Sequence, residues 1–118
     1  TGMSLDILGN DPSSRVLIQT LMEECQNIGE AVGARFNVSL ENRINGAASI
    51  IGHKPSTRQD IELKRPLEID PIMSAIIEIG TKLNIPTPML KHINGILKLK
   101  ATYLGLYTRN ELIDKLTV

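Results

Sequence analysis

Tryptophan is absent from this 118-residue chain, and the sequence has only one cysteine, one phenylalanine and two tyrosines. So few aromatic rings provide almost no platform on which single-stranded nucleic acid could stack its bases. The single thiol, Cys25, has no second cysteine with which to form an internal disulfide or a metal site. This cysteine usage is typical of a reducing compartment, and we expect a cytoplasmic protein.

Net charge and long apolar runs are lacking as well. Thirteen basic and thirteen acidic residues give a formal net charge of zero, so no long-range field favours nucleic acid or anionic lipid. No apolar run reaches the roughly eighteen residues that a membrane span requires. His53 and His92 have no histidine or cysteine at metal-ligand spacing. The sequence therefore predicts no nucleic-acid, membrane or metal partner.

The strongest signals that are present mark helix starts. A potential capping residue precedes proline at Asp11-Pro12, Asp70-Pro71 and Thr87-Pro88. Its side chain can accept from free backbone N–H groups, and proline suits the first helical position because its missing donor would go unused there. Further starts are the capping boxes Ser56-x-x-Gln59 and Thr108-x-x-Glu111, and a cap at Ser39.

Apolar residues recur every three to five positions after these starts, which is the spacing of amphipathic helices. The expected helices cover residues 12–32, 40–52, 56–63, 71–85, 88–104 and 109–116. No strand-like alternation runs longer than a few residues. The pattern predicts an all-α fold, a bundle of about five to six helices that forms a single domain over residues 1–118.

A polar, turn-rich region interrupts the helical pattern between His53 and Asp70. It contains Ser-x-x-Gln-Asp-Ile at 56–61 and Arg-Pro-x-Glu-Ile-Asp at 65–70, and Ile-Pro-Thr-Pro follows at 85–88. This series resembles the signature of the C-terminal domain of ketopantoate reductases. The likeness extends over most of the chain, because residues 1–12 and 22–24 also resemble that domain.

The resemblance implies a helical domain of the 6-phosphogluconate dehydrogenase-like type, which closes the cleft over the substrate. Such enzymes reduce ketopantoate to pantoate with hydride from NADPH, which an N-terminal Rossmann domain binds; the step supplies pantothenate and coenzyme A. This chain has no Gly-x-Gly-x-x-Gly loop, so we expect no cofactor bound to it. The family's proton-donating lysine belongs to a helix before position 1, and we expect the chain alone to be inactive.

Two residues carry the family's site by resemblance. Ser56 matches the serine that hydrogen-bonds the substrate, and a hydroxyl at a helix start can help backbone N–H groups to hold a carboxylate. Glu68 matches the catalytic glutamate of the cleft, near substrate and nicotinamide. Beside an anionic substrate, a carboxylate must be partly protonated or aimed at hydroxyl donors, and we favour an orienting role for Glu68 over proton transfer.

Structural roles compete with these functional ones. Ser56 alone is a good helix cap, and Glu68 alone is an ordinary solvated charge before a helix. We assign Asp70 to capping, and Gln59 and Asp60 to holding the turn. The remaining basic cluster is interpreted as a solvated helix face rather than a phosphate site; it comprises Lys91, Lys98 and Lys100.

Two other functions stay open at this point. A helical module derived from the family could work by self-association, since apolar surface left uncovered tends to be buried by a second copy. A related dehydrogenase acting on another 2-keto acid is the other, because part of the substrate pocket lies outside this chain. We expect a homo-oligomer for the reductase domain as well as for these alternatives.

Overall fold

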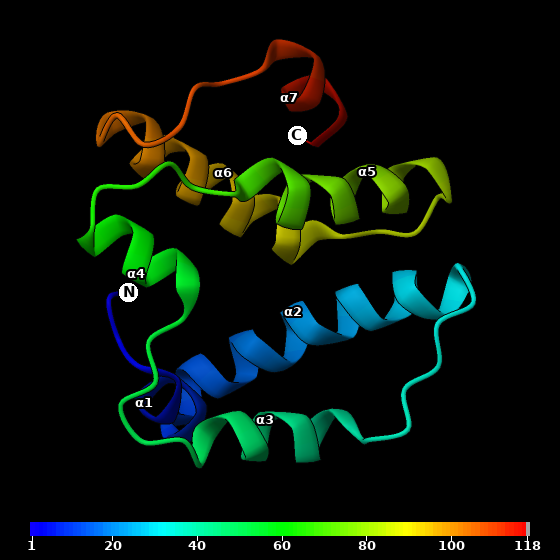
Figure 1. Cartoon of the computed structure of the whole chain (residues 1–118). Coiled ribbons are helices and arrows are strands. Elements are labelled where there is room, and N and C mark those ends of the chain that lie inside the picture. Colours follow the sequence, from blue (N-terminus) through cyan, green and yellow to red (C-terminus); the bar gives the residue numbers. More distant parts are fainter. Residues whose placement is uncertain (118) are drawn as a thin grey trace. The chain divides into compact units, whose positions relative to one another are not determined.

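The computed structural model describes residues 1–117, and within this range the chain is all helical, with seven α-helices, one π-helical turn and no strand (Figure 1). The fold class is confirmed, with one or two helices more than predicted. The chain divides into two compact units, Thr1–Gln59 and Asp60–Val118. The elements are α1 Leu5–Asn10, α2 Pro12–Ala31, α3 Leu40–Ala48, α4 Ser56–Glu62, η1 Asp70–Ser74, α5 Ala75–Lys82, α6 Pro88–Tyr103 and α7 Glu111–Thr117.

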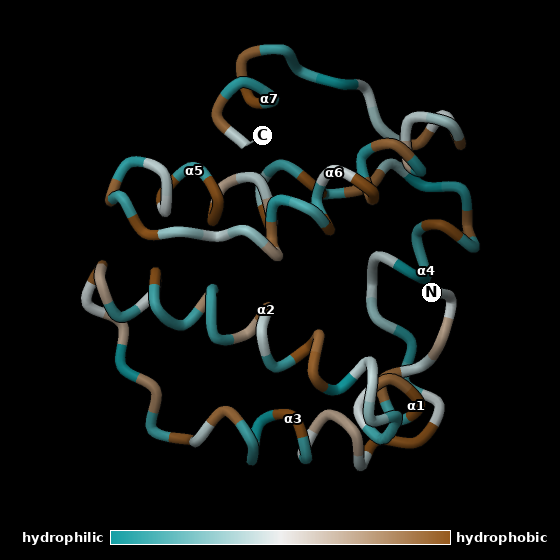
Figure 2. The backbone as a smooth tube through the Cα atoms, turned by 180° about the vertical axis from the view of Figure 1, so that it is seen from behind, coloured by the Kyte–Doolittle hydropathy of each residue, from teal (hydrophilic) through white to brown (hydrophobic). Residues whose placement is uncertain are grey.

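The first unit is built on the long helix α2, which starts as predicted. The Asp11 carboxylate accepts a hydrogen bond from the backbone N–H of Ser14 at 2.8 Å, and Pro12 occupies the first position of the helix. The helix ends at Ala31, and Gly33 follows with φ +93°, a conformation that glycine adopts without steric cost. Hydrophobic and hydrophilic stretches alternate along α2, as an amphipathic helix requires (Figure 2).

Helix α1 was not predicted, because it is short and its N-cap Ser4 makes no side-chain capping bond. It is fixed by tertiary contacts instead. The Leu5 N–H donates to the His53 carbonyl at 3.0 Å, and the Asn10 amide donates to the Ala48 carbonyl at 3.3 Å. Both bonds join α1 to the end of α3 and the turn after it, so the start of the chain is part of the packed unit.

Helix α3 begins as predicted, with the Ser39 hydroxyl accepting from the Asn42 N–H at 3.2 Å. Its predicted end at Gly52 is wrong, because the helix stops at Ala48 and residues 49–52 form turns. The Gly52 N–H donates to the Asp6 carboxylate at 3.0 Å, a tertiary bond that a continued helix would not allow.

The second unit encloses a small apolar core between the segment that precedes η1, helix α6 and the loop after it. The Leu67 N–H donates to the Leu106 carbonyl at 2.9 Å and ties the two non-helical segments together. Helices α5 and α7 also contact one another in this unit. The buried residues of the core are Leu67, Ile69, Ala101 and Leu106, with Ile61, Leu97 and Tyr107 packed against them.

Three of the predicted capping arrangements are wrong in this half of the chain. The Asp70 side chain does not cap a helix; the segment begins with a π-helical turn and the carboxylate is used in tertiary bonds. Thr87 precedes α6 but its buried hydroxyl makes no capping bond. Helix α7 is capped by Asn110, whose side chain accepts from the N–H of Leu112 at 3.0 Å, so Thr108 lies outside it.

Among residues 1–117, no helix combines the length and the apolar character needed to cross a membrane.

Candidate functional site

Ser56 is the first residue of α4, and its side chain is exposed. The predicted capping box is not formed, because Ser56 is itself the first helical residue, and the Gln59 side-chain amide donates to the Lys54 carbonyl at 2.8 Å. The first helical hydrogen bond runs from the Gln59 N–H to the Pro55 carbonyl at 3.1 Å. Gln59 therefore holds the turn in shape, as predicted, while the hydroxyl of Ser56 lies outside that bond.

The turn after α4 uses the backbone of Asp60. Its carbonyl accepts from the Arg65 N–H at 2.8 Å, and the intervening Lys64 has φ +54°. A left-handed residue at this position is a common way to end a helix, although it is usually glycine. The predicted role of Asp60 in shaping this turn is thus carried by its main chain.

Glu68 is the last residue of the non-helical segment before η1 and lies between two buried neighbours. Leu67 and Ile69 are 7% and 2% exposed, respectively, whereas Glu68 is exposed. The backbone enters the helical region at Ile69, which has φ −72° and ψ −48°. The carboxylate of Glu68 is therefore presented to solvent from a segment whose backbone is fixed on both sides.

Two residues after Glu68, the Asp70 carboxylate binds side chains from three segments of the chain. The Ser74 hydroxyl donates to it at 2.7 Å, the Tyr107 hydroxyl at 2.9–3.0 Å, and the Lys98 ammonium lies 3.3 Å away. Lys98 also contacts Asp114 of α7 at 2.7 Å. We call Asp70, Lys98, Tyr107 and Asp114 the Lys98 network.

The interpretation of Lys98 as part of a solvated helix face is wrong. Lys98 is 2% exposed, whereas Lys100 is exposed and Lys91 intermediate. The periodicity contained the signal, because Leu90, Asn94 and Lys98 follow at intervals of four and share the buried face of α6.

The network shifts the pKa values of its members in a consistent way. Burial disfavours the charged form of Asp70, but hydrogen bonds from Ser74, Tyr107 and Lys98 outweigh it and lower its pKa. Burial likewise opposes the charge of Lys98, but hydrogen bonds with Asp114, Tyr107 and Asp70 raise its pKa. Burial and the bond to Asp70 raise the pKa of Tyr107. At neutral pH Asp70 is therefore a carboxylate, Lys98 an ammonium and Tyr107 a neutral phenol.

These shifts predict a plateau of stability at intermediate pH. The Asp70 contribution is present above the ordinary aspartate pKa, about 3.9, and is lost as pH falls through the lower folded value. The Lys98 contribution is present below the ordinary lysine pKa, about 10.4, and is lost as pH rises through the higher folded value. Urea unfolding across the pH range measures this, and Asp70→Asn should make the acid limb shallower. An unchanged acid limb in that variant would contradict the assignment.

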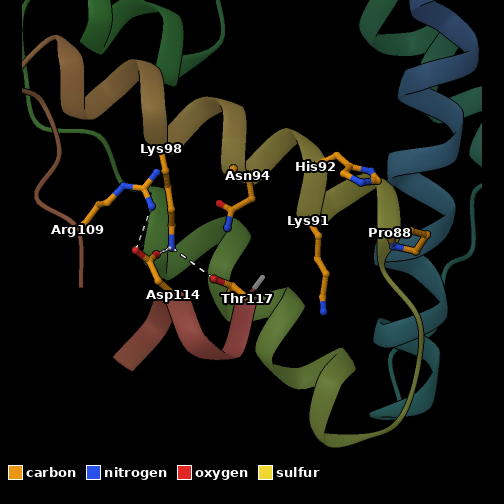
Figure 3. Close-up of a pocket in the computed structure, with 9 residues that line it drawn as sticks. Pro88, Lys91, His92, Asn94, Lys98, Arg109, Asp114 and Thr117 are labelled. Carbon is orange, nitrogen blue, oxygen red and sulfur yellow. Dashed lines mark hydrogen bonds and ion pairs between the residues drawn. The ribbon is translucent and has the colours of Figure 1, made fainter. Parts of the chain in front are cut away.

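A pocket of about 360 Å³ opens beside the Lys98 network (Figure 3). In Figure 3, Lys98 and Asn94 extend from α6 toward α7, where Asp114 and Thr117 meet the ammonium. Arg109 pairs with Asp114 at 3.4 Å, so the charges beside Lys98 are largely matched. The lining residues are Pro88, Lys91, His92, Asn94, Gly95, Lys98, Arg109, Asp114 and Thr117.

The two residues predicted by resemblance, Ser56 and Glu68, lie in different units, and the structure describes each within its own. Neither lines the pocket next to Lys98. In the described part of the chain, no three histidine, cysteine or carboxylate side chains are grouped as a metal site. Chemically, the chain thus presents an exposed hydroxyl at a helix start and an exposed carboxylate on an anchored segment.

Three comparisons with known proteins agree with one another. Residues 1–101 match the family described as Ketopantoate reductase PanE/ApbA C terminal. A 2-dehydropantoate 2-reductase from Mesorhizobium japonicum (strain LMG 29417 / CECT 9101 / MAFF 303099) is 38% identical over 108 residues, which are 92% of this chain and 33% of that protein.

A crystal structure from Ralstonia solanacearum MolK2, ascribed to a ketopantoate reductase, superposes with a TM-score of 0.83 and 30% identity. The match covers 90% of this chain and 32% of the solved chain. The all-helical fold is therefore shared with such a protein, and the family resemblance seen in the sequence is confirmed. The chain spans about a third of the length of the relatives that it matches.

Proposed function

The chain belongs to the ketopantoate reductase family, as its C-terminal domain, and from this premise we propose that it forms the substrate side of an NADPH-dependent 2-dehydropantoate 2-reductase. The reaction is the reduction of ketopantoate to pantoate, which leads to pantothenate and coenzyme A. In this proposal the partner of the chain is an N-terminal Rossmann domain. The substrate binds in the cleft between that domain and this chain, and this chain closes the cleft over it.

The proposal places the dinucleotide-binding site for NADPH on the partner domain rather than on this chain. A dinucleotide's pyrophosphate is usually held by a glycine-rich turn between a strand and a helix, and residues 1–117 form no strand. When the cofactor is bound by the partner domain, it supplies the hydride that adds to the keto carbon. The residues of this chain then bind and orient the substrate.

Glu68 supports this proposal most strongly. Its backbone is anchored by the buried side chains of Leu67 and Ile69 and by the bond from the Leu67 N–H to the Leu106 carbonyl. A carboxylate held in this way can accept a hydrogen bond from the hydroxyl group of ketopantoate and orient it without taking part in proton transfer. Preorganisation of this kind is what a substrate-orienting group requires.

Ser56 complements Glu68 chemically. Its hydroxyl can donate to the substrate carboxylate at the start of α4, where free backbone N–H groups carry partial positive charge. The Gln59 side chain, bonded to the Lys54 carbonyl at 2.8 Å, holds the approach to this helix without using the serine. In this proposal the Ser56 hydroxyl binds the carboxylate of ketopantoate, and the Glu68 carboxylate binds its hydroxyl group. The two side chains thus match the two polar ends of the substrate.

Kinetics of the complete reductase that carries this chain test both roles. Glu68→Gln should lower kcat/KM for ketopantoate by about 10- to 100-fold, since a hydrogen bond to a charged group contributes about 1.5–3 kcal/mol. Ser56→Ala should lower it by a similar factor, about 10- to 100-fold, because the hydrogen bond that this change removes goes to the charged substrate carboxylate. Assays with several 2-keto acids separate ketopantoate from a related substrate.

Two control variants distinguish binding from folding. Ser39→Ala removes a helix cap of α3 that has no proposed substrate contact, and Glu41→Gln changes an exposed carboxylate on the same helix. Both should leave kcat/KM unchanged. Unchanged kinetics in Ser56→Ala and Glu68→Gln together would refute the site.

A homo-oligomer is also part of the proposal. One face of α6 exposes Ile96, Leu99 and Tyr103, which are 66%, 64% and 89% accessible and follow at three- and four-residue spacing. A second copy could bury this stripe. Sedimentation of the complete protein should show an oligomer that Leu99→Glu dissociates, whereas Ile51→Glu, at another exposed apolar side chain, should leave it intact. A monomeric parent protein would remove this part of the proposal.

A further inference from the structure

The segment that carries Glu68 is fixed on its other side by the Lys98 network. Asp70 lies two residues after Glu68, and its carboxylate binds Ser74 in its own turn, Lys98 on α6 and Tyr107 in the loop after α6. These contacts come from elements that are far apart in the sequence. Polar bonds to Asp70 therefore fix the backbone that follows Glu68. The apolar core fixes the backbone that precedes it.

We propose that the Lys98 network positions Glu68 for substrate binding, so that Asp70, Lys98, Tyr107 and Asp114 act on the reaction through Glu68 without touching the substrate. The inference rests on the proposed function of Glu68. It adds residues that the family match does not reach, since the match ends at residue 101 and Tyr107 and Asp114 follow it.

The geometry at Asp70 supports a positioning role. A carboxylate in front of a helix ordinarily caps it, but no side-chain cap is present here, and Asp70 begins a π-helical turn. The Ala75 N–H reaches back five residues to the Asp70 carbonyl, and the Ser74 hydroxyl reaches the carboxylate at 2.7 Å. Turns of this type are rare and frequently occur at functional sites. The Asp70 carboxylate thus binds Lys98 and Tyr107 instead of capping the helix.

The charge of Lys98 explains why helix α7 is part of the Lys98 network. The Lys98 side chain is 3% exposed, and its ammonium is 2.7 Å from Asp114 and 3.3 Å from Asp70. A buried ammonium requires such partners, because desolvation otherwise favours its neutral form. Asp114 on α7 thereby keeps Lys98 charged, and the charged Lys98 holds Asp70. The Tyr107 ring lies 5.7 Å from the same ammonium and its hydroxyl bonds Asp70.

A double-mutant cycle in the complete reductase tests this coupling. Tyr107→Phe removes the hydroxyl that bonds Asp70 but keeps the ring beside Lys98, so the fold should survive; a melting curve checks this. We expect kcat/KM for ketopantoate to fall by about 3- to 10-fold in Tyr107→Phe, the value of about one hydrogen bond. In a Glu68→Gln background the same change should lower kcat/KM by less than about 2-fold, since a network acting through Glu68 has nothing left to position.

Ser49→Ala is the control, because it removes an exposed side-chain hydroxyl that donates to the Gly46 carbonyl at 2.8 Å outside the network, and it should have no effect in either background. Asp114→Asn tests the α7 arm and should show the same dependence on Glu68. If Glu68→Gln is slow but Tyr107→Phe is as fast as the parent, or slows both backgrounds equally, the network is only structural and this inference is wrong. If Glu68→Gln itself is unaffected, the proposed function fails, and the inference fails with it.

Discussion

Replacing Lys98 by methionine should lower the free energy of unfolding by about 3 kcal/mol, because removing one partner of a buried ion pair leaves an uncompensated charge. Methionine retains most of the aliphatic volume, so the loss reports the ammonium rather than a cavity. Asp70 keeps its bonds from Ser74 and Tyr107 in this variant. Asp114 is the group left poorly compensated, with only Arg109 at 3.4 Å among its described partners. Urea unfolding of the 118-residue chain at neutral pH measures the effect.

Lys82→Met is the matched control. Lys82 pairs with Glu78 at 2.7 Å, the same separation as Lys98 and Asp114, but its side chain is 69% exposed. An exposed pair of this kind contributes about 0.3–0.5 kcal/mol. Adding Asp114→Asn to Lys98→Met should recover part of the loss, since it removes the stranded charge. Equal effects of Lys98→Met and Lys82→Met would show that burial does not matter here.

Gly9→Ala should destabilise the first unit by about 2 kcal/mol, within the range for forcing extra atoms into a packed contact. A Cβ atom at Gly9 would lie 2.6 Å from the Cβ of Ala48 and 3.3 Å from its Cα, so α1 and α3 could no longer approach as closely. This loss exceeds the gain of up to about 1 kcal/mol that alanine ordinarily brings to a helix interior. Thermal or urea unfolding of the full chain measures the difference.

Gly46→Ala provides the comparison within the same unit. Gly46 lies inside α3, and a Cβ atom there would meet nothing within 4 Å. This variant should therefore be stabilised, by up to about 1 kcal/mol. Ala48→Gly should partly rescue Gly9→Ala by removing the nearer of the clashing atoms. Stabilisation by Gly9→Ala itself would refute the close contact of α1 and α3.

The sequence predicted those elements whose causes are local. The capping residue Asp11 followed by Pro12 correctly predicted the start of α2, and Pro88 correctly predicted the start of α6. The predicted end of α2 at residue 32 is one residue late, because the helix stops at Ala31 and Gly33 follows in a left-handed conformation. The motifs at 56–61, 65–70 and 85–88 identified the family, and with it the type of helical fold, because such a signature consists only of residues in a given order and spacing along the chain.

The errors concern residues whose partners come from elsewhere in the fold. Asp70 has the local pattern of a cap, but Lys98 and Tyr107, 28 and 37 residues away, compete successfully for its carboxylate. Helix α1 depends on bonds to His53 and Ala48, which no local pattern contains. A charged residue at a core-facing position of an amphipathic helix is a signal that could have identified Lys98, since its burial requires a partner.

The central claim is that Ser56 and Glu68 of this chain contact the substrate of a ketopantoate reductase. The most direct measurement is a crystal structure of the complete reductase that carries the chain, with NADP and pantoate bound. Our account predicts the Ser56 hydroxyl within hydrogen-bond distance of the pantoate carboxylate, and the Glu68 carboxylate within such distance of a pantoate hydroxyl. Pantoate held by other residues, with both of these side chains facing solvent, would contradict it.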